Sequence, residues 1–287
     1  KIKKFFSKLL PSIFSSGVTQ INILIGTIIA SFQASAVSYL YYADRIYQIN
    51  LAIAGIAIGT VILPKLSKLI ESGNNSEILL IQNKALELSL FFSIPATIAL
   101  FIASDLIVSA LFGYGSFSEI SVQNSALALF YFSFGLPAFS LIKVFSSFFF
   151  ARHNTKIPFY ISLISVLINI VISISLFQKV GFIIIPIATS ISSWINVVFL
   201  YIYLKKNFFF TFNNILLYRF PRILLSSIIM GLIFYFSLNI FNEKLIYLEN
   251  LKFIYLFLCI FLALISYVAL SIFTKAFKLS DINLKYK

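Results

Sequence analysis

Eight long apolar runs dominate the sequence and restrict the folds open to it. They cover approximately residues 9–32, 36–63, 86–105, 125–151, 157–177, 180–204, 221–241 and 252–274. A helix of about 20 apolar residues spans the roughly 30 Å hydrocarbon core of a bilayer. With 60% hydrophobic and 11% charged residues, the chain lacks the polar side chains needed to cover a water-soluble fold. We therefore predict an all-α polytopic transmembrane bundle of about eight spans.

The basic residues predict how this bundle is oriented, because Lys and Arg accumulate in short cytoplasmic segments. If both termini are cytoplasmic, 17 of the 22 basic residues fall in inner segments. The outer loops then hold only Lys179, Lys244 and Lys252. The net charge of +13 therefore reflects topology, and we expect no nucleic-acid partner. Residues 65–84 are predicted to form a cytoplasmic loop and residues 105–124 an outer loop.

Two adjacent ionisable residues, Asp44 and Arg45, lie inside the second predicted span. A charged side chain in a membrane helix costs about 2.5 to 3.5 kcal/mol on insertion scales, so it indicates a functional site. Neighbouring residues point about 100° apart on a helix, and the two therefore need partners elsewhere. Because a guanidinium matches phosphate oxygens well, Arg45 favours an anionic ligand. An interhelical ion pair is the structural alternative.

Polar side chains also recur at helical spacing in three spans. Such a stripe lines either a cavity or a tight helix–helix seam, and for a single stripe the seam is the more frequent outcome. Lys143, in the fourth span, is expected to extend towards the inner headgroups. Bends are expected at Pro95, at Gly135 with Pro137, and at Pro186. The stripes comprise Ser12, Ser16, Thr19, Gln20 and Asn22; Ser162, Ser165, Asn169 and Ser173; and Thr189, Ser192, Ser193 and Asn196.

Several kinds of chemistry are excluded by composition. The one cysteine, Cys259, and the one histidine, His153, allow neither a disulfide framework nor a multi-residue Cys or His metal site. The sequence contains no glycine-rich phosphate loop and no nucleophile with a neighbouring base. We predict no catalytic site and no metal centre, and interpret the chain as a transporter rather than an enzyme.

Specific motifs resemble the MurJ/MviN lipid II flippases, a family of the MOP exporter superfamily. The run 38–46 with 55–60 and 63–67 is similar to the family's eighth helix, and 20–22 with 30–32 to the preceding one. Residues 135–144, 150–152 and 155–158 resemble the tenth helix and its following loop, and 188–190 the twelfth. The resemblance covers essentially the whole chain, as the C-terminal half of a fourteen-helix flippase. It implies a six-helix lobe at 1–204, two further helices at 205–287 forming a lipid-tail groove, and a missing N-terminal six-helix lobe as partner.

The resemblance also implies a function and a site. It implies flipping of lipid II for peptidoglycan synthesis and cell shape across the bacterial inner membrane by alternating access, with membrane potential as the driving force. The family's cavity arginine corresponds to Arg45, beside Asp44, and Asn22, Asn169 and Thr189 to cavity or ion-site residues. Because the family's acidic sodium ligand falls at Gly26, we expect no tight sodium site and no cofactor. The alternatives are a flippase for another polyprenyl-linked oligosaccharide, a multidrug exporter, a polyprenyl-phosphate transferase or a non-transporting scaffold.

Overall fold

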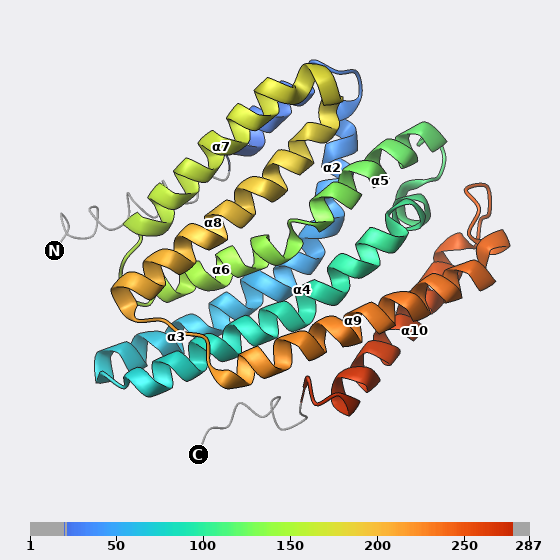
Figure 1. Cartoon of the computed structure of the whole chain (residues 1–287). Helices are drawn as coiled ribbons and strands as arrows, with labels where there is room; N and C mark the ends of the chain where they lie inside the picture. The colour runs from blue at the N-terminus through green and yellow to red at the C-terminus, as the bar shows by residue number, and fades with distance from the viewer. Residues whose placement is uncertain (1–19, 21, 278–287) are drawn as a thin grey trace.

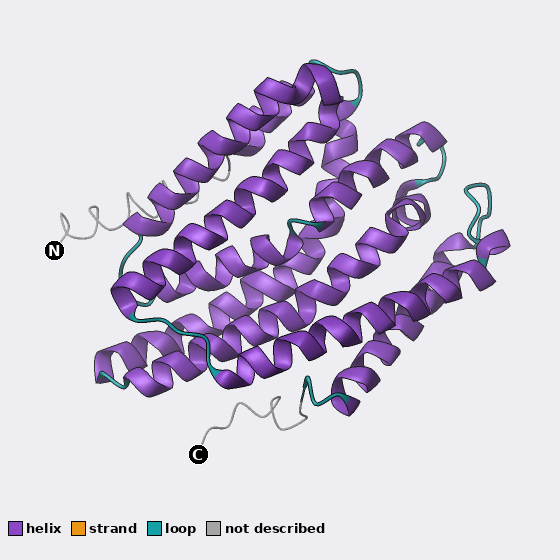
Figure 2. Cartoon of the chain, viewed as in Figure 1, coloured by secondary structure: helices purple, strands orange, loops and turns teal. Residues whose placement is uncertain are grey.

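A computed structural model describes residues 20 and 22–277 of the chain, and within this part every regular element is a helix (Figures 1 and 2). A helical segment reaches Ala30 before the first labelled helix. The main helices are α2 (Ala36–Leu51), α3 (Ile58–Ser72), α4 (Asn75–Phe112), α5 (Glu119–Ser133), α6 (Leu136–Phe150), α7 (Lys156–Val180), α8 (Ile184–Phe208), α9 (Asn214–Ile240) and α10 (Lys252–Phe273). A π-helical segment, η1 (Ala52–Ala57), joins α2 to α3, and short 3-10 turns, η2 (Gly181–Ile183) and η3 (Asn242–Lys244), follow α7 and α9.

These helices match the predicted membrane spans. Within the described residues, five continuous helical stretches are long and apolar enough to cross a membrane, or six if the bent pair α5 and α6 is one span. The stretch Lys156–Phe208 turns back at Gly181, which has a φ of 74° that glycine tolerates without strain. It therefore supplies two predicted spans, α7 and α8, which lie side by side (Figure 1). Half of the first predicted span, residues 9–19 and 21 with Ser12, Ser16 and Thr19 of its polar stripe, lies outside the described residues.

The two predicted loops are much shorter than expected. The segment 65–84 is helical except for a turn at Gly73 and Asn74, because Gly73 ends α3 with a φ of 71° and Asn74 caps α4 by accepting from the Glu77 backbone N–H. At the other end α4 continues to Phe112, and Ser118 caps α5. A two-residue turn at 73–74 therefore replaces the first predicted loop and a six-residue connection at 113–118 the second, with capping residues at the helix ends.

The predicted bend at Gly135 and Pro137 is confirmed, with α5 and α6 meeting at 48°. Two side chains of α8 bond the carbonyls that the break frees. The Ser190 hydroxyl donates to the Tyr131 carbonyl at 2.8 Å and the Trp194 indole to the Phe134 carbonyl at 2.9 Å. The break is thereby stabilised inside the bundle, where water is excluded.

The bend predicted at Pro186 is wrong, and the bend predicted at Pro95 stays a prediction. Pro186 is the third residue of α8, where its missing N–H costs no helical hydrogen bond. Pro95 lies in a helical part of α4, and the non-helical residue of that helix is Ala103.

The helices form an elongated bundle in which α4 lies between α3, α5 and α6 on one side and α9 and α10 on the other. The predicted cytoplasmic connections 72–75, 150–156 and 208–214 lie at one end of the bundle (Figure 1). The predicted outer connections, 112–119, 180–184 and 240–252, lie at the opposite end. Asn83 of α4 holds the 208–214 connection, since its amide donates to the Thr211 carbonyl and accepts from the Asn213 N–H. This arrangement agrees with the prediction from the basic residues that successive connections lie alternately on the two sides of the membrane.

Two glycines, Gly55 of η1 and Gly59 of α3, lie against the backbone of α6. A Cβ added to Gly55 would lie 3.0 Å from the Ser140 Cα, and one added to Gly59 would lie 3.2 Å from the Lys143 carbonyl oxygen. Small residues allow such backbone contact between membrane helices. Gly26, in contrast, leaves room for a methyl group, which would lie 3.6 Å from an Ile185 methyl.

We predict that Gly55→Ala destabilises the protein by about 1 to 2 kcal/mol, because backbone atoms of α6 must shift to admit the methyl group. Gly26→Ala makes the same chemical change where space exists, and it should leave stability unchanged or slightly raised because alanine favours helix. Thermal unfolding of the full-length protein in detergent compares the two variants. Equal effects would contradict the close-contact interpretation.

Candidate functional site

The two predicted substrate-binding residues lie next to each other on α2 but in different surroundings. Arg45 is exposed, and its guanidinium carbon lies 4.6 Å from the centre of the Tyr41 ring. Asp44 is half-buried and accepts a hydrogen bond from the Gln48 amide one turn later. Among the described residues, no carboxylate forms an ion pair with Arg45. The interhelical ion pair considered as an alternative is therefore absent from this part of the chain, and substrate binding stays a prediction.

A polar cavity of about 170 Å³ lies beside this region. The predicted stripes of α7 and α8 face each other across it, the segment before α2 contributes Asn22, and Lys143 of α6 reaches it. The stripes thus line a cavity rather than only a seam. Its polar lining comprises Asn22, Tyr47, Lys143, Ser162, Ser165, Thr189, Ser192, Ser193 and Asn196.

Two of the candidate ion-site residues, Asn169 and Thr189, bond each other in the seam between α7 and α8, and Thr189 also lines the cavity. The Asn169 amide of α7 donates to the Thr189 hydroxyl of α8 at 3.0 Å, and its carbonyl oxygen accepts from Ser173 at 3.0 Å. Thr189 donates its own proton to the Ile185 carbonyl. Asn22 contributes to the cavity, whereas Asn169 does not line it. Within the described residues no cluster of three or more His, Cys, Asp or Glu side chains exists, and sodium binding stays untested.

An apolar groove of about 410 Å³ runs between α4, α9 and α10. Phe91, Pro95 and Ala96 form its α4 wall, and Phe234 and Leu264 belong to its α9 and α10 walls. A hydrogen bond of 2.7 Å from the Tyr267 hydroxyl to the Phe91 carbonyl joins α10 to α4 beside it. The groove has the lining expected for a hydrocarbon chain.

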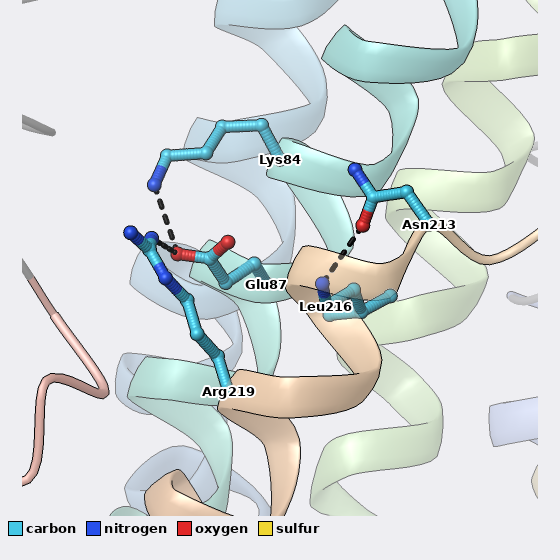
Figure 3. Close-up of polar contacts among 5 residues, drawn as sticks. All are labelled: Lys84, Glu87, Asn213, Leu216 and Arg219. Carbon is cyan, nitrogen blue, oxygen red and sulfur yellow. Dashed lines mark hydrogen bonds and ion pairs between the residues drawn. The ribbon is translucent and has the colours of Figure 1, made fainter.

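A second apolar hollow of about 250 Å³ continues from this groove, since Ile53 and Phe92 line both. Lys65 and Lys84 also line it. Lys84 pairs with Glu87 at 2.8 Å, and Glu87 with Arg219 of α9 at 2.5 Å (Figure 3). Glu87 and Arg219 are both buried. The Glu87–Arg219 pair joins α9 to α4. Sequence analysis missed both ion pairs, although Lys84 precedes Glu87 by about one helical turn.

Lys252 also differs from its expected place in an outer loop. Only 1% of the residue is exposed. Its ammonium group donates to the Gly113 carbonyl at 2.7 Å and to the Tyr247 carbonyl at 2.6 Å, and it lies 4.3 Å from the centre of the Tyr114 ring. The Tyr247 hydroxyl donates to the Phe117 carbonyl. The connection between α9 and α10 is thereby held against the one between α4 and α5.

Comparisons with known proteins identify relatives of this chain in sequence and in structure. A family model described as "Lipid II flippase MurJ" matches residues 1–258. A "Probable lipid II flippase MurJ" of Rhizobium meliloti is 38% identical over 238 residues, which cover 83% of this chain and 44% of that protein. One from Rickettsia prowazekii is 38% identical over 205 residues, covering 71% of this chain and 40% of the relative.

Solved structures agree with the sequence relatives. "Lipid II flippase MurJ, inward closed conformation" is similar with a TM-score of 0.78 and 28% identity, over 96% of this chain and 55% of that one. A structure titled "Crystal structure of MATE in the bent conformation" has a TM-score of 0.59 at 16% identity, over 93% of this chain and 64% of that one, which shows a common fold alone. The chain spans about half the length of the curated relatives it matches.

We predict that Glu87→Leu destabilises the protein by about 3 kcal/mol, because it removes the carboxylate beside the buried Arg219 and the partly buried Lys84. Glu87→Leu combined with Arg219→Leu should recover part of this loss, since apolar side chains then meet between α4 and α9. Thermal unfolding of the full-length protein measures both. Independent, additive losses in the double variant would show that the ion pair does not couple the helices.

Proposed function

Because the chain belongs to the lipid II flippase MurJ family, we propose that it is the C-terminal lobe of a flippase that moves lipid II across the bacterial inner membrane. The observation that carries this proposal is the exposed Arg45 on a membrane-spanning helix. An arginine there is costly unless a partner or ligand meets its charge. The pyrophosphate of lipid II is an anionic group that a guanidinium binds through paired hydrogen bonds.

The lipid tail of the substrate has a matching surface in the groove between α4, α9 and α10. We infer that the polyprenyl chain lies there while the headgroup occupies the space between this lobe and an N-terminal six-helix lobe. The groove is apolar along most of its lining, and transfer of a hydrocarbon chain between lipid and such a groove costs little free energy. The tail therefore stays in an apolar environment while the headgroup crosses.

The orientation proposed from the basic residues puts the turn between α3 and α4 at the cytoplasmic side. The headgroup then enters from the cytoplasm, meets Arg45, and leaves outside after the two lobes rock. Because the cell interior is negative, each net negative charge carried outward gains about 2.3 kcal/mol for each 100 mV. Membrane potential is thus sufficient to drive an anionic substrate, and the chain's own residues need only bind and release it.

We predict that Arg45→Ala abolishes complementation of a strain depleted of its lipid II flippase, while the full-length protein accumulates normally in the membrane. Arg45→Lys should complement partially at best, because a point charge replaces a fork-shaped donor. Lys206→Ala, which removes an exposed cation at the end of α8, is the control that keeps full activity. Complementation by Arg45→Ala at the wild-type level would refute the proposed role.

The tail groove makes a separate prediction. Ala96→Phe fills the groove between α4 and α10 and should slow or stop complementation, because the tail and the added ring compete for the same volume. Ala269→Phe introduces the same ring on an exposed position of α10 outside the groove and should be tolerated. Equal growth of the two variants at equal expression would argue against tail binding here.

A further inference from the structure

Arg45 lies on one exposed face of α2 and η1. Side chains four residues apart share a helical face, and the members of this face are Val37, Tyr41, Arg45, Ile49 and Ile53, all of them exposed. Of the two neighbours one turn from Arg45, Ile49 is apolar, whereas Tyr41 carries an aromatic ring whose face attracts a cation. Tyr41 is therefore the partner that this face offers to the guanidinium.

The contact between Tyr41 and Arg45 holds the guanidinium without cancelling its charge. The guanidinium carbon lies 4.6 Å from the ring centre, within the reach of a cation–π interaction. A ring has no net charge, so it leaves the positive charge of the guanidinium for a ligand. A carboxylate in the same place would take two N–H donors and neutralise that charge.

Asp44 is the nearest carboxylate in sequence, and its hydrogen bond lies elsewhere. The Asp44 side chain is half-buried and accepts from the Gln48 amide one turn later. Neighbouring residues point about 100° apart on a helix, so Asp44 and Arg45 do not share a face. Within the described part of the chain, no carboxylate pairs with Arg45, and the ring of Tyr41 takes that place.

An aromatic cluster supports the ring of Tyr41. The Tyr42 ring lies 5.8 Å from it, edge to face at 81°. Tyr42 in turn lies 4.8 Å from Phe112 and 4.8 Å from Phe117, again measured between ring centres. Tilted and edge-to-face contacts are the favourable geometries for aromatic pairs. The neighbour of Tyr41 is thereby anchored on the connection between α4 and α5.

We propose that Tyr41 is a positioning residue for Arg45, an inference that rests on the proposed function. The ring holds the guanidinium on the exposed face before the substrate arrives, and the fork then meets the pyrophosphate with less loss of side-chain freedom. Ordering a long, exposed side chain on binding costs affinity, and a side chain that is already held avoids part of this cost. Tyr41 acts through Arg45 and makes no contact with the lipid itself.

The test measures the equilibrium affinity of the purified full-length protein for lipid II. Tyr41→Leu removes the ring and keeps an apolar side chain, and it should weaken the affinity about 3- to 10-fold. Tyr41→Phe keeps the ring and should remain within about twofold of the wild type. In a protein that already carries Arg45→Ala, adding Tyr41→Leu should weaken the affinity no further, because no guanidinium is left to position.

A second pair of the same spacing supplies the matched control. Tyr218 of α9 is exposed one turn before Arg222, whose guanidinium carbon lies 3.5 Å from the Tyr218 ring centre. Tyr218→Leu removes an equivalent contact away from Arg45 and should leave the affinity unchanged. If Tyr41→Leu does not accumulate in the membrane, Tyr41→Met makes the same comparison with another side chain that lacks a ring.

Three results would overturn the positioning role. The first is an unchanged affinity in Tyr41→Leu when Arg45→Ala binds weakly. The second is an equal loss in Tyr41→Phe and Tyr41→Leu, because the hydroxyl rather than the ring would then matter. The third is a further loss when Tyr41→Leu is added to Arg45→Ala, since the ring would then contact the lipid directly. An unchanged affinity in Arg45→Ala itself contradicts the proposed function as well, so this variant distinguishes the two failures.

Discussion

The structure depends on one constraint, which is that polar groups within a bilayer must find partners inside the protein. The break between α5 and α6 is acceptable because Ser190 and Trp194 bond the carbonyls that it frees. The buried ion pair of Glu87 with Arg219 ties α9 to α4 in the same way at one end of the bundle. At the other end Lys252 holds two connections by bonding their carbonyls. Polar contacts thus fix where the last two helices lie, while apolar packing fills the space between them.

The same constraint draws attention to Arg45 and Lys143, two cationic side chains that take no part in these contacts. Arg45 lies exposed on α2 with its guanidinium carbon 4.6 Å from the centre of the Tyr41 ring, and Lys143 is an exposed residue that lines the cavity from α6. The two side chains differ in chemistry as well as in position. Arg45 suits an external anion because a guanidinium forks onto phosphate oxygens, whereas the Lys143 ammonium is a compact, strongly hydrated point charge.

Much of this arrangement was predictable from the sequence, because the length of a hydrophobic run determines whether a helix can span a membrane and the basic residues indicate its orientation. The helices from Ala36 onwards and the bend at Gly135 follow from run length and from glycine with proline. The lengths of the loops could not be predicted in this way, since two residues, Gly73 and Asn74, are enough to connect α3 to α4. Contacts between distant segments were also missed. Glu87 and Arg219 are far apart in sequence, and Lys252 resembles an ordinary loop lysine until the fold buries it. Polar stripes predicted the cavity residues but left open whether a cavity forms.

The central claim is that Arg45 holds the anionic headgroup of the lipid-linked substrate. Its most direct test is the equilibrium affinity of the purified full-length protein for lipid II, compared between the wild type and Arg45→Ala at matched ionic strength. Loss of a charge-assisted interaction worth about 1.5 to 3 kcal/mol predicts an affinity about 10- to 100-fold weaker in the variant. Equal affinities for the two proteins would contradict the account.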